Sequence, residues 1–233
     1  MGTGLKTFFV SRWQYYTRDR SQDFEGEYTQ WRAARIRAIL RHYGDPIFWR
    51  DKVIVEVGAG FGATGAVFAR LGGRVFCVEG REENTNIIKV RAPDVTAMTW
   101  DLNEGIPDVG QPIDVLIHMG VLYHLRDPEA SIRESCRKCQ HLILETECSD
   151  SDDPQFTTNA TEPAFYRDQS LDGIGSRPSP AFVERVMREE GMKFEMLNDS
   201  SCNVARHHYD WPVLNTKNFK NGQRRLWFAR RSS

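Results

Sequence analysis

Short apolar runs alternate with amphipathic segments through the middle of the chain. Five runs have the β-branched, apolar composition of buried strands: residues 52–57, 74–79, 95–100, 113–119 and 141–146. Three segments between them carry apolar residues at helical spacing: residues 66–71, 81–90 and 128–139. Strands that alternate with helices of this length favour parallel pairing with right-handed crossovers, and therefore an open sheet covered on both faces.

The segments before and after this region predict further helices and strands. Residues 23–43 predict an amphipathic helix within an N-terminal helical extension over 1–48. Residues 149–180 are rich in Ser, Asp, Pro, Thr and Gly, which predicts a long surface excursion on the acceptor side. A helix that starts at Pro180 and two closing strands, 192–197 and 225–229, follow. The predicted fold is one α/β domain over 1–233, with a Rossmann-like, mostly parallel seven-stranded sheet and a C-terminal antiparallel hairpin.

Composition and charge narrow the class of protein. The chain has 233 residues, is 40% hydrophobic and has a formal net charge of -1, so no overall positive field would gather nucleic acid or a membrane. It has no apolar run long enough to span a membrane. The apolar stretch among its first residues is too short for a signal peptide. We therefore expect a cytoplasmic protein without a membrane partner.

The cysteines do not indicate a metal-binding site. Their odd number and scattered positions fit reduced thiols better than a disulfide framework. Cys136 and Cys139 form a C-x-x-C pair, but zinc needs four ligands and no second such pair follows. We expect no bound metal.

A glycine-rich loop follows the first predicted strand. Gly58, Gly60 and Gly62 occupy the position where an open parallel sheet contacts its ligand, and glycine lets the backbone lie directly against that ligand. The loop also satisfies the G-x-G-x-x-G/A fingerprint of dinucleotide sites. Glu79, which ends the second strand, would hold ribose hydroxyls in either class. The loop alone therefore leaves NAD and S-adenosylmethionine open.

Three further features favour S-adenosylmethionine. Glu56 stands two residues before the first glycine, the glycines fall as G-x-G-x-G, and Asp101 follows the third strand. With these motifs, the segment 50–147 resembles the class I S-adenosylmethionine-dependent methyltransferases. The resemblance implies S-adenosyl-L-methionine as cofactor, with Glu56 near the methionine amino group, Glu79 at the ribose and Asp101 at the adenine. The expected cofactor-binding residues are Glu56, Gly58, Ala59, Gly60, Gly62, Glu79, Gly80, Asp101, Leu102 and Met119. An NAD-binding oxidoreductase and an inactive module with this fold remain the alternatives.

The end of the fourth strand carries the candidate catalytic residues. In an open sheet, cofactor and acceptor meet at this edge, and His118, Tyr123 and His124 fall there. Methyl transfer to a hydroxyl needs an aligned nucleophile and removal of its proton, for which histidine is suited near neutral pH. We predict His124 as general base, His118 as second choice, and Tyr123 as a group that positions the acceptor. His124 is otherwise explained as a backbone-bonding residue at the start of the next helix.

Two weaker resemblances concern the acceptor. Residues 119–124, with Pro128 after them, and the closing strand with Arg224 ahead of it are similar to the family that carboxymethylates wobble uridine in tRNA. That family holds its carboxylated cofactor with a lysine in a Trp-rich segment, and residues 28–32 contain no lysine, so we infer ordinary methyl transfer. Residues 142–147 and 164–167 look like methyltransferases that cap polysaccharides or other glycans. A sugar hydroxyl is the acceptor that this second resemblance implies.

Polar and aromatic residues late in the chain are candidates for acceptor binding. They could stack on a sugar ring and bond its hydroxyls, or belong to an ordinary loop; the candidates are Tyr166, Arg167, His207, Tyr209, Trp211 and Arg224. A C-terminal basic run favours tRNA as an alternative acceptor: Lys217, Lys220, Arg224, Arg225, Arg230 and Arg231. The sequence favours an O-methyltransferase for a sugar, glycan or related small molecule, with a tRNA-modifying enzyme as the alternative.

Overall fold

The computed structural model describes Phe24 and residues 26–231. The predicted N-terminal extension is therefore described only in part, because its residues 1–23 and 25 lie outside this range. Within the described residues, no helix combines the length and apolar content needed to cross a membrane.

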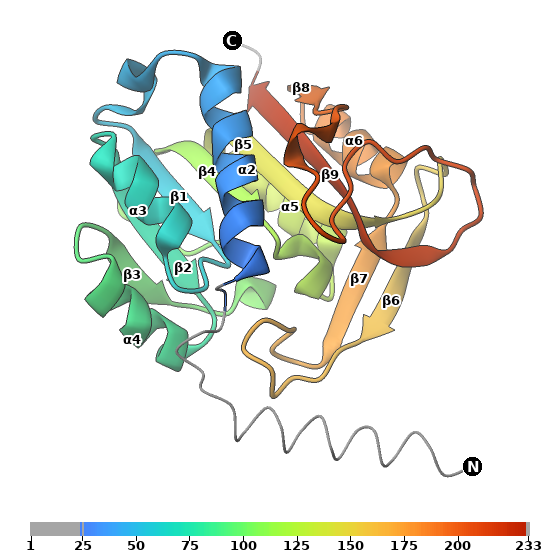
Figure 1. Cartoon of the computed structure of the whole chain (residues 1–233), viewed down its shortest axis with the longest axis horizontal. Helices are drawn as coiled ribbons and strands as arrows, with labels where there is room; N and C mark the ends of the chain where they lie inside the picture. The colour runs from blue at the N-terminus through green and yellow to red at the C-terminus, as the bar shows by residue number, and fades with distance from the viewer. Residues whose placement is uncertain (1–23, 25, 232–233) are drawn as a thin grey trace.

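A seven-stranded sheet forms the centre of the molecule (Figure 1). Its strands lie in the order β3-β2-β1-β4-β5-β9-β8, and they are β1 (Val53–Val57), β2 (Arg74–Glu79), β3 (Thr96–Thr99), β4 (Ile113–Met119), β5 (Cys139–Ser149), β8 (Met192–Met196) and β9 (Phe219–Arg231). The first five strands pair in parallel, and β9 runs antiparallel to both β5 and β8. The Rossmann-like sheet and the antiparallel closing strands that the sequence predicts are confirmed. Strand order reverses between β1 and β4, the place where such sheets bind ligands.

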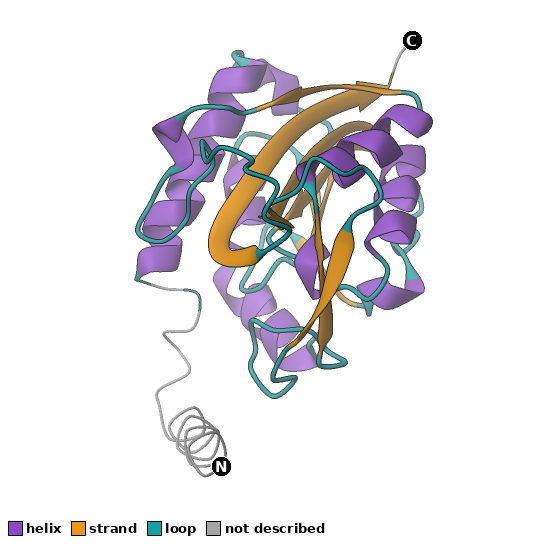
Figure 2. Ribbon diagram, turned by 90° about the vertical axis from the view of Figure 1, so that its right-hand side faces the viewer, coloured by secondary structure: helices purple, strands orange, loops and turns teal. Residues whose placement is uncertain are grey.

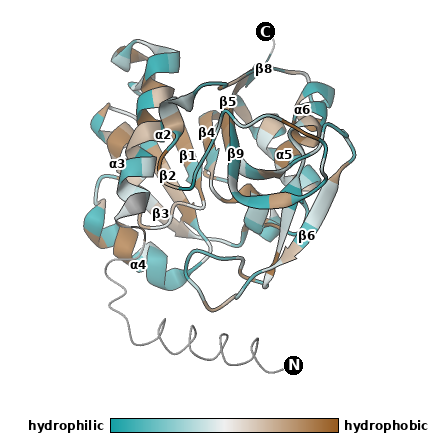
Figure 3. Cartoon of the chain, turned by 45° about the vertical axis from the view of Figure 1, so that its right-hand side comes forward, coloured by the Kyte–Doolittle hydropathy of each residue, from teal (hydrophilic) through white to brown (hydrophobic). Residues whose placement is uncertain are grey.

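Helices cover both faces of the sheet (Figure 2). One face packs against α2 (Glu27–Tyr43), α3 (Ala63–Arg70) and α4 (Glu82–Arg91), and the other against α5 (Pro128–Lys138) and α6 (Pro180–Glu189). The last two begin with proline and are capped by Asp127 and Ser179, whose side chains accept from backbone amides. Figure 3 shows apolar residues concentrated along the central strands, so the sheet separates two apolar cores. The predicted helices are confirmed within a few residues at their ends.

The excursion after β5 contains structure that the sequence pattern did not predict. β6 (Thr157–Thr161) and β7 (Ile174–Pro178) form a separate two-stranded antiparallel sheet. Their sequences, TTNAT and IGSRP, lack alternating apolar residues, and neither strand contributes a residue to the two apolar cores; β7 packs instead against β5 and the turn after β4. The residues between the two strands, 162–173, form a loop that returns to the ligand-binding edge of the main sheet.

A buried ion pair connects the closing strand to the middle of the sheet. Arg224 of β9 donates to Glu145 (3.0 Å) and Glu147 (3.2 Å) of β5, and Arg35 of α2 donates to Glu145 from the other side (3.2 Å). Arg224 is 3% exposed and Glu145 is fully buried. Arg224 also donates to the Tyr123 hydroxyl (3.0 Å). One buried charge cluster therefore joins a helix, two strands and the turn after β4.

Replacing Arg224 by methionine should cost about 3–5 kcal/mol of folding free energy, because it leaves buried carboxylates without their main cation. The midpoint of urea unfolding, followed by tryptophan fluorescence, measures this loss. Arg230→Ala, on the exposed end of the same strand, is the matched control and should change stability by less than about 0.5 kcal/mol. Equal midpoints for the two variants would contradict a structural role for the ion pair.

Candidate functional site

The loop after β1 presents bare backbone to the ligand-binding edge. Gly58 and Gly60 have φ values of +65° and +56°, a region that favours glycine. A Cβ on Gly58 would lie 2.6 Å from the Val121 side chain, so only glycine allows this approach. Gly62 serves a different purpose. It caps α3 with φ +74°, and a Cβ there would lie 2.9 Å from Ile88, so this glycine allows helix packing and lines no cavity of the cleft.

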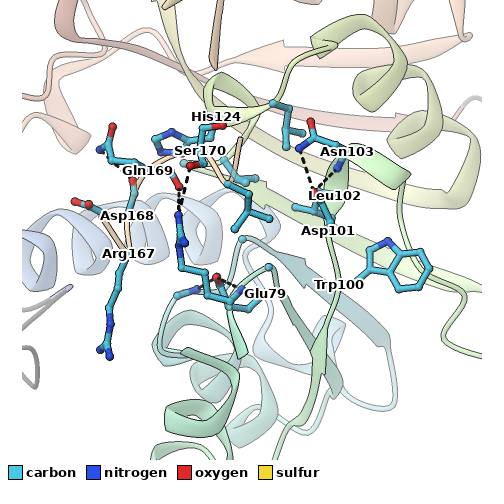
Figure 4. Close-up of a pocket in the computed structure, with 18 of the residues that line it drawn as sticks. Glu79, Trp100, Asp101, Leu102, Asn103, His124, Arg167, Asp168, Gln169 and Ser170 are labelled. Atoms are coloured by element: carbon cyan, nitrogen blue, oxygen red, sulfur yellow. Dashed lines mark hydrogen bonds between the residues drawn. The ribbon is translucent and has the colours of Figure 1, made fainter. Parts of the chain in front are cut away.

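Two adjoining cavities of about 90 and 80 Å³ lie at the carboxyl ends of β1, β2 and β4. We call them the first and second cavity. They are parts of one cleft because six residues line both: Phe24, Gly58, Gly60, Gly120, His124 and Asp168. Figure 4 shows the first cavity between residues 100–103 on one side and residues 167–170 on the other. Nine of the ten predicted cofactor-binding residues line this cleft, with Gly62 the exception.

Two carboxylates are held at fixed positions around the first cavity. Glu79 accepts from the amides of Gly60 (2.9 Å) and Arg81 (3.1 Å), and from the Asn84 side chain (3.2 Å). Burial raises the pKa of Glu79 above its ordinary value, although these three donors oppose the shift. Asp101 accepts from the backbone and side-chain nitrogens of Asn103 at 2.9 and 3.0 Å. Both acids therefore stand preorganised at strand ends, as the sequence predicts.

Glu56 is a buried acid that lines the second cavity. Its Oε2 accepts from the Gly65 amide at 2.8 Å and from the Cys77 thiol at 3.6 Å. Burial raises the pKa of Glu56 to about 7, even though these hydrogen bonds favour the ionised form. A cation placed beside this carboxyl would favour ionisation, so binding of a cation and loss of a proton are coupled here.

His124 is paired with a carboxylate. It lies in the short helix η4 (Leu122–His124), and its Nδ1 is 2.5 Å from Oε2 of Glu162, just after β6. Oε2 also accepts from the Ser170 amide (2.8 Å), and Oε1 accepts from Arg177 (2.9 Å). Burial disfavours the charge on Glu162, but hydrogen bonds from His124, Ser170 and Arg177 hold its pKa below the usual range. Sequence patterns gave no signal for Glu162, because it lies 38 residues from its partner.

The other predicted catalytic residues lie in different surroundings. His118 is 1% exposed, lines neither cavity and bonds Ser131 at 3.1 Å; burial lowers its pKa to about 4. Tyr123 lines the second cavity with its hydroxyl accepting from Arg224, and burial raises its pKa to about 12. Of the two candidate histidines, the structure places only His124 in the cleft.

Most of the predicted acceptor residues lie in the interior. Arg167 lines the first cavity, whereas Tyr166 lines neither cavity. His207 stacks on Trp31 at 4.0 Å, and burial lowers its pKa to about 3. Tyr209 bonds Glu145 and Trp31 from a fully buried position. The positions of these side chains, together with buried Trp211 and Arg224, give no support to their predicted stacking on an acceptor.

Two residues of the predicted basic run are also unavailable to a ligand. Arg224 and Arg225 are each 3% exposed, and the Arg225 guanidinium donates to the carbonyls of Tyr209 and Trp211. The run therefore does not form one phosphate-binding surface. Cys136 and Cys139 are buried free thiols, and the described residues contain no cluster of three or more His, Cys, Asp or Glu side chains able to hold a metal.

Helix α2 supplies a wall that the sequence analysis missed. Tyr28, Trp31, Arg32 and Arg35 all line the second cavity. Their spacing of i, i+3, i+4 and i+7 marks one helix face, and aromatic rings beside arginines on it are the signal that could have found them. The Tyr28 hydroxyl donates to Asp168 at 3.2 Å, so this wall meets the 162–173 loop across the cavity.

Known proteins resemble this chain in sequence motif and in fold. Residues 55–141 match the family described as a methyltransferase domain. The N-terminal domain of EvdMO1 with SAH bound is 20% identical with a TM-score of 0.65, and covers 87% of this chain and 81% of its own. The same domain in the presence of SAH and D-fucose is 21% identical at TM-score 0.65, covering 90% and 86%.

A third solved structure is similar over nearly its whole length. Magnesium protoporphyrin IX methyltransferase (ChlM) from Synechocystis PCC 6803 with bound SAH is 16% identical, with TM-score 0.58 and coverage of 97% and 95%. No curated protein sequence matches the chain. Of the two cofactor classes that the glycine loop left open, the match to a methyltransferase domain supports S-adenosyl-L-methionine.

The residues of the cleft fit this cofactor. Gly58 and Gly60 offer bare backbone, and the first cavity combines apolar Leu102 and Val121 with the two fixed acids. We expect Glu79 to hold the ribose hydroxyls, Asp101 to face the adenine amino group, and Glu56 to face the methionine ammonium.

The pKa of Glu56 predicts a pH-dependent cofactor affinity. A group with pKa about 7 is about one-tenth ionised at pH 6 and nine-tenths at pH 8, so the dissociation constant for S-adenosylhomocysteine should fall about tenfold over that range. Isothermal titration calorimetry measures it. Glu56→Gln should bind more weakly at pH 8 and show a flat profile. A wild-type profile as flat as that of the variant would refute the assigned contact.

Proposed function

We propose that this chain, a class I S-adenosylmethionine-dependent methyltransferase, methylates a hydroxyl group of a sugar, glycan or related small molecule, with His124 as general base. The observation that carries the proposal is the pair formed by His124 and Glu162 at the junction of the two cavities. A histidine held by a carboxylate in a cleft is suited to take a proton from a hydroxyl.

Glu162 determines which imidazole nitrogen acts. An ionised carboxylate only accepts hydrogen bonds, so Nδ1 carries the proton that bonds Glu162, and Nε2 keeps the lone pair. The Ser170 amide and Arg177 fix the carboxylate from the far side. The pair therefore fixes the orientation of the imidazole for proton transfer, and the Glu162 carboxylate stabilises the imidazolium that results.

The reaction needs alignment and one proton transfer. S-adenosyl-L-methionine supplies, when bound, a methyl carbon on a positively charged sulfur that departs as a neutral thioether. As the acceptor oxygen forms its bond to that carbon and the carbon–sulfur bond breaks, His124 takes the hydroxyl proton at Nε2 and later releases it to water. Glu56 and the glycine backbone keep the donor side fixed, while α2 shapes the acceptor side.

The lining of the second cavity supports a sugar-type acceptor. Tyr28 and Tyr123 supply aromatic surface, and Asp168 and Arg35 supply polar groups that can bond hydroxyls. This combination of aromatic faces and a few convergent polar groups is typical of small-molecule sites. The similarity in fold to a domain crystallised in the presence of SAH and D-fucose also supports this class.

The acceptor class is tested by transfer of a labelled methyl group to a panel of monosaccharides, oligosaccharides, nucleosides and unmodified tRNA. We expect incorporation only into sugars or glycans, at an oxygen identified by mass spectrometry. Incorporation only into nucleosides or tRNA, with a rate that falls steeply as salt is added, would establish the alternative nucleic-acid acceptor.

The base is tested by His124→Gln, which should lower kcat by about 10²- to 10⁴-fold. Affinity for S-adenosylhomocysteine should change little, because the substitution leaves the acids and the glycine loop intact. His118→Gln is the control: this residue lies outside the cleft, so the folded variant should keep near-normal turnover. Near-normal turnover in His124→Gln would exclude base catalysis by this residue.

A further inference from the structure

We propose that Arg81 is a positioning residue that holds residues 162–172, here called the closing loop, over the cofactor and thereby brings Glu162 to His124. The inference rests on the proposed function through the pairing of these two side chains. It adds one requirement to that function. Glu162 is in position to pair with His124 only while Arg81 holds the closing loop beside the first cavity.

The Arg81 guanidinium binds the closing loop at three backbone carbonyls. Its Nη2 donates to Ala164 (2.8 Å), Gln169 (3.1 Å) and, more weakly, Ser170 (3.4 Å). Ala164 lies in the first half of the loop and the other two residues lie in the second half, so one side chain holds the two halves together. Hydrogen bonds from a charged donor are stronger than neutral ones, and the part-buried position of this cation limits screening.

The same part of the chain holds the predicted ribose acid. The Arg81 amide donates to Glu79 at 3.1 Å, and Asn84 donates to Glu79 at 3.2 Å while reaching the Arg167 carbonyl at 3.5 Å. Leu171 packs on the adjacent Gly80, where a Cβ would lie 2.6 Å from its Cδ1. The acid and the closing loop therefore share their supports.

One residue carries the connection from Arg81 to the base. Ser170 accepts from Arg81 through its carbonyl and donates through its amide to Glu162 Oε2 at 2.8 Å. That same oxygen bonds His124 at 2.5 Å. A shift of Ser170 away from Arg81 would therefore move a donor away from the carboxylate that orients the imidazole.

The closing loop forms part of the first cavity, where the cofactor is expected to bind. The cavity measures about 90 Å³, and residues 167–171 of the closing loop form one wall of it. These residues lie opposite residues 100–103, so a nucleoside bound in the cavity would lie between the two walls (Figure 4). A bound cofactor would therefore contact the same loop that Arg81 holds and that contains Glu162, the partner of His124.

The experiment compares wild type with Arg81→Met and with Arg126→Met. Arg126 is the matched control because it pairs with Asp172 at 3.0 Å on the exposed rim of the same loop. Hydrogen exchange of residues 162–172 with saturating S-adenosylhomocysteine should show protection in wild type and Arg126→Met, and loss of that protection in Arg81→Met. This readout does not depend on activity.

Turnover and its pH profile give the second readout. With saturating cofactor, Arg81→Met should lose about 10- to 100-fold in kcat, since misplacing a catalytic group by about 1 Å has effects of this size. The acid limb of its pH–rate profile should shift in the same direction as in Glu162→Gln, which a merely weakened cofactor site would not cause. Arg126→Met should match wild type in both.

The two proposals fail in different ways. Protection of the closing loop that is equal in wild type and Arg81→Met, or a pH profile unchanged by Arg81→Met, would overturn the positioning role. If Arg81→Met loses protection while His124→Gln keeps normal turnover, Arg81 does position the closing loop, but His124 is not the general base.

Discussion

The buried pairing of Arg224 with Glu145 is the interaction on which the proposed acceptor side of the cleft depends. Two charges in the interior are costly unless every partner is satisfied, and here Arg35 and Tyr209 complete the environment of Glu145. Because Arg35 lies on α2, the cluster ties that helix to the centre of the sheet. Trp31, between Arg35 and His207, is fixed by the same contacts and holds the cavity wall in place.

The cofactor half of the cleft was predictable from sequence because its signals are local. A strand followed by spaced glycines, and acids at the ends of the next two strands, place Glu56, Glu79 and Asp101 at one edge by topology alone. Gly62 matched the motif and lies outside the cleft, since the motif does not distinguish glycines that contact a ligand from those that permit helix packing.

The acceptor half was predicted less well because it is built from distant segments. The position of Glu162 beside His124 depends on how a polar excursion folds back, and no periodicity encodes that path. The polar and aromatic sequence around His207, Tyr209 and Trp211 is compatible with either an acceptor-binding surface or an ordinary loop. Their partners, Arg224, Arg225 and Glu145, make the same residues an interior cluster, and only the tertiary structure shows this.

The two ends of the excursion are pinned close to the main domain. The Ser149 hydroxyl donates to the Arg177 carbonyl at 2.9 Å, and the Ser179 hydroxyl donates to the Asp153 carbonyl at 2.7 Å. The intervening residues therefore leave and rejoin the main sheet at one place, which these two hydrogen bonds fix. An incoming segment grafted at this place would therefore have to supply two things: a carboxylate to pair with His124, and the wall that residues 167–171 contribute to the first cavity.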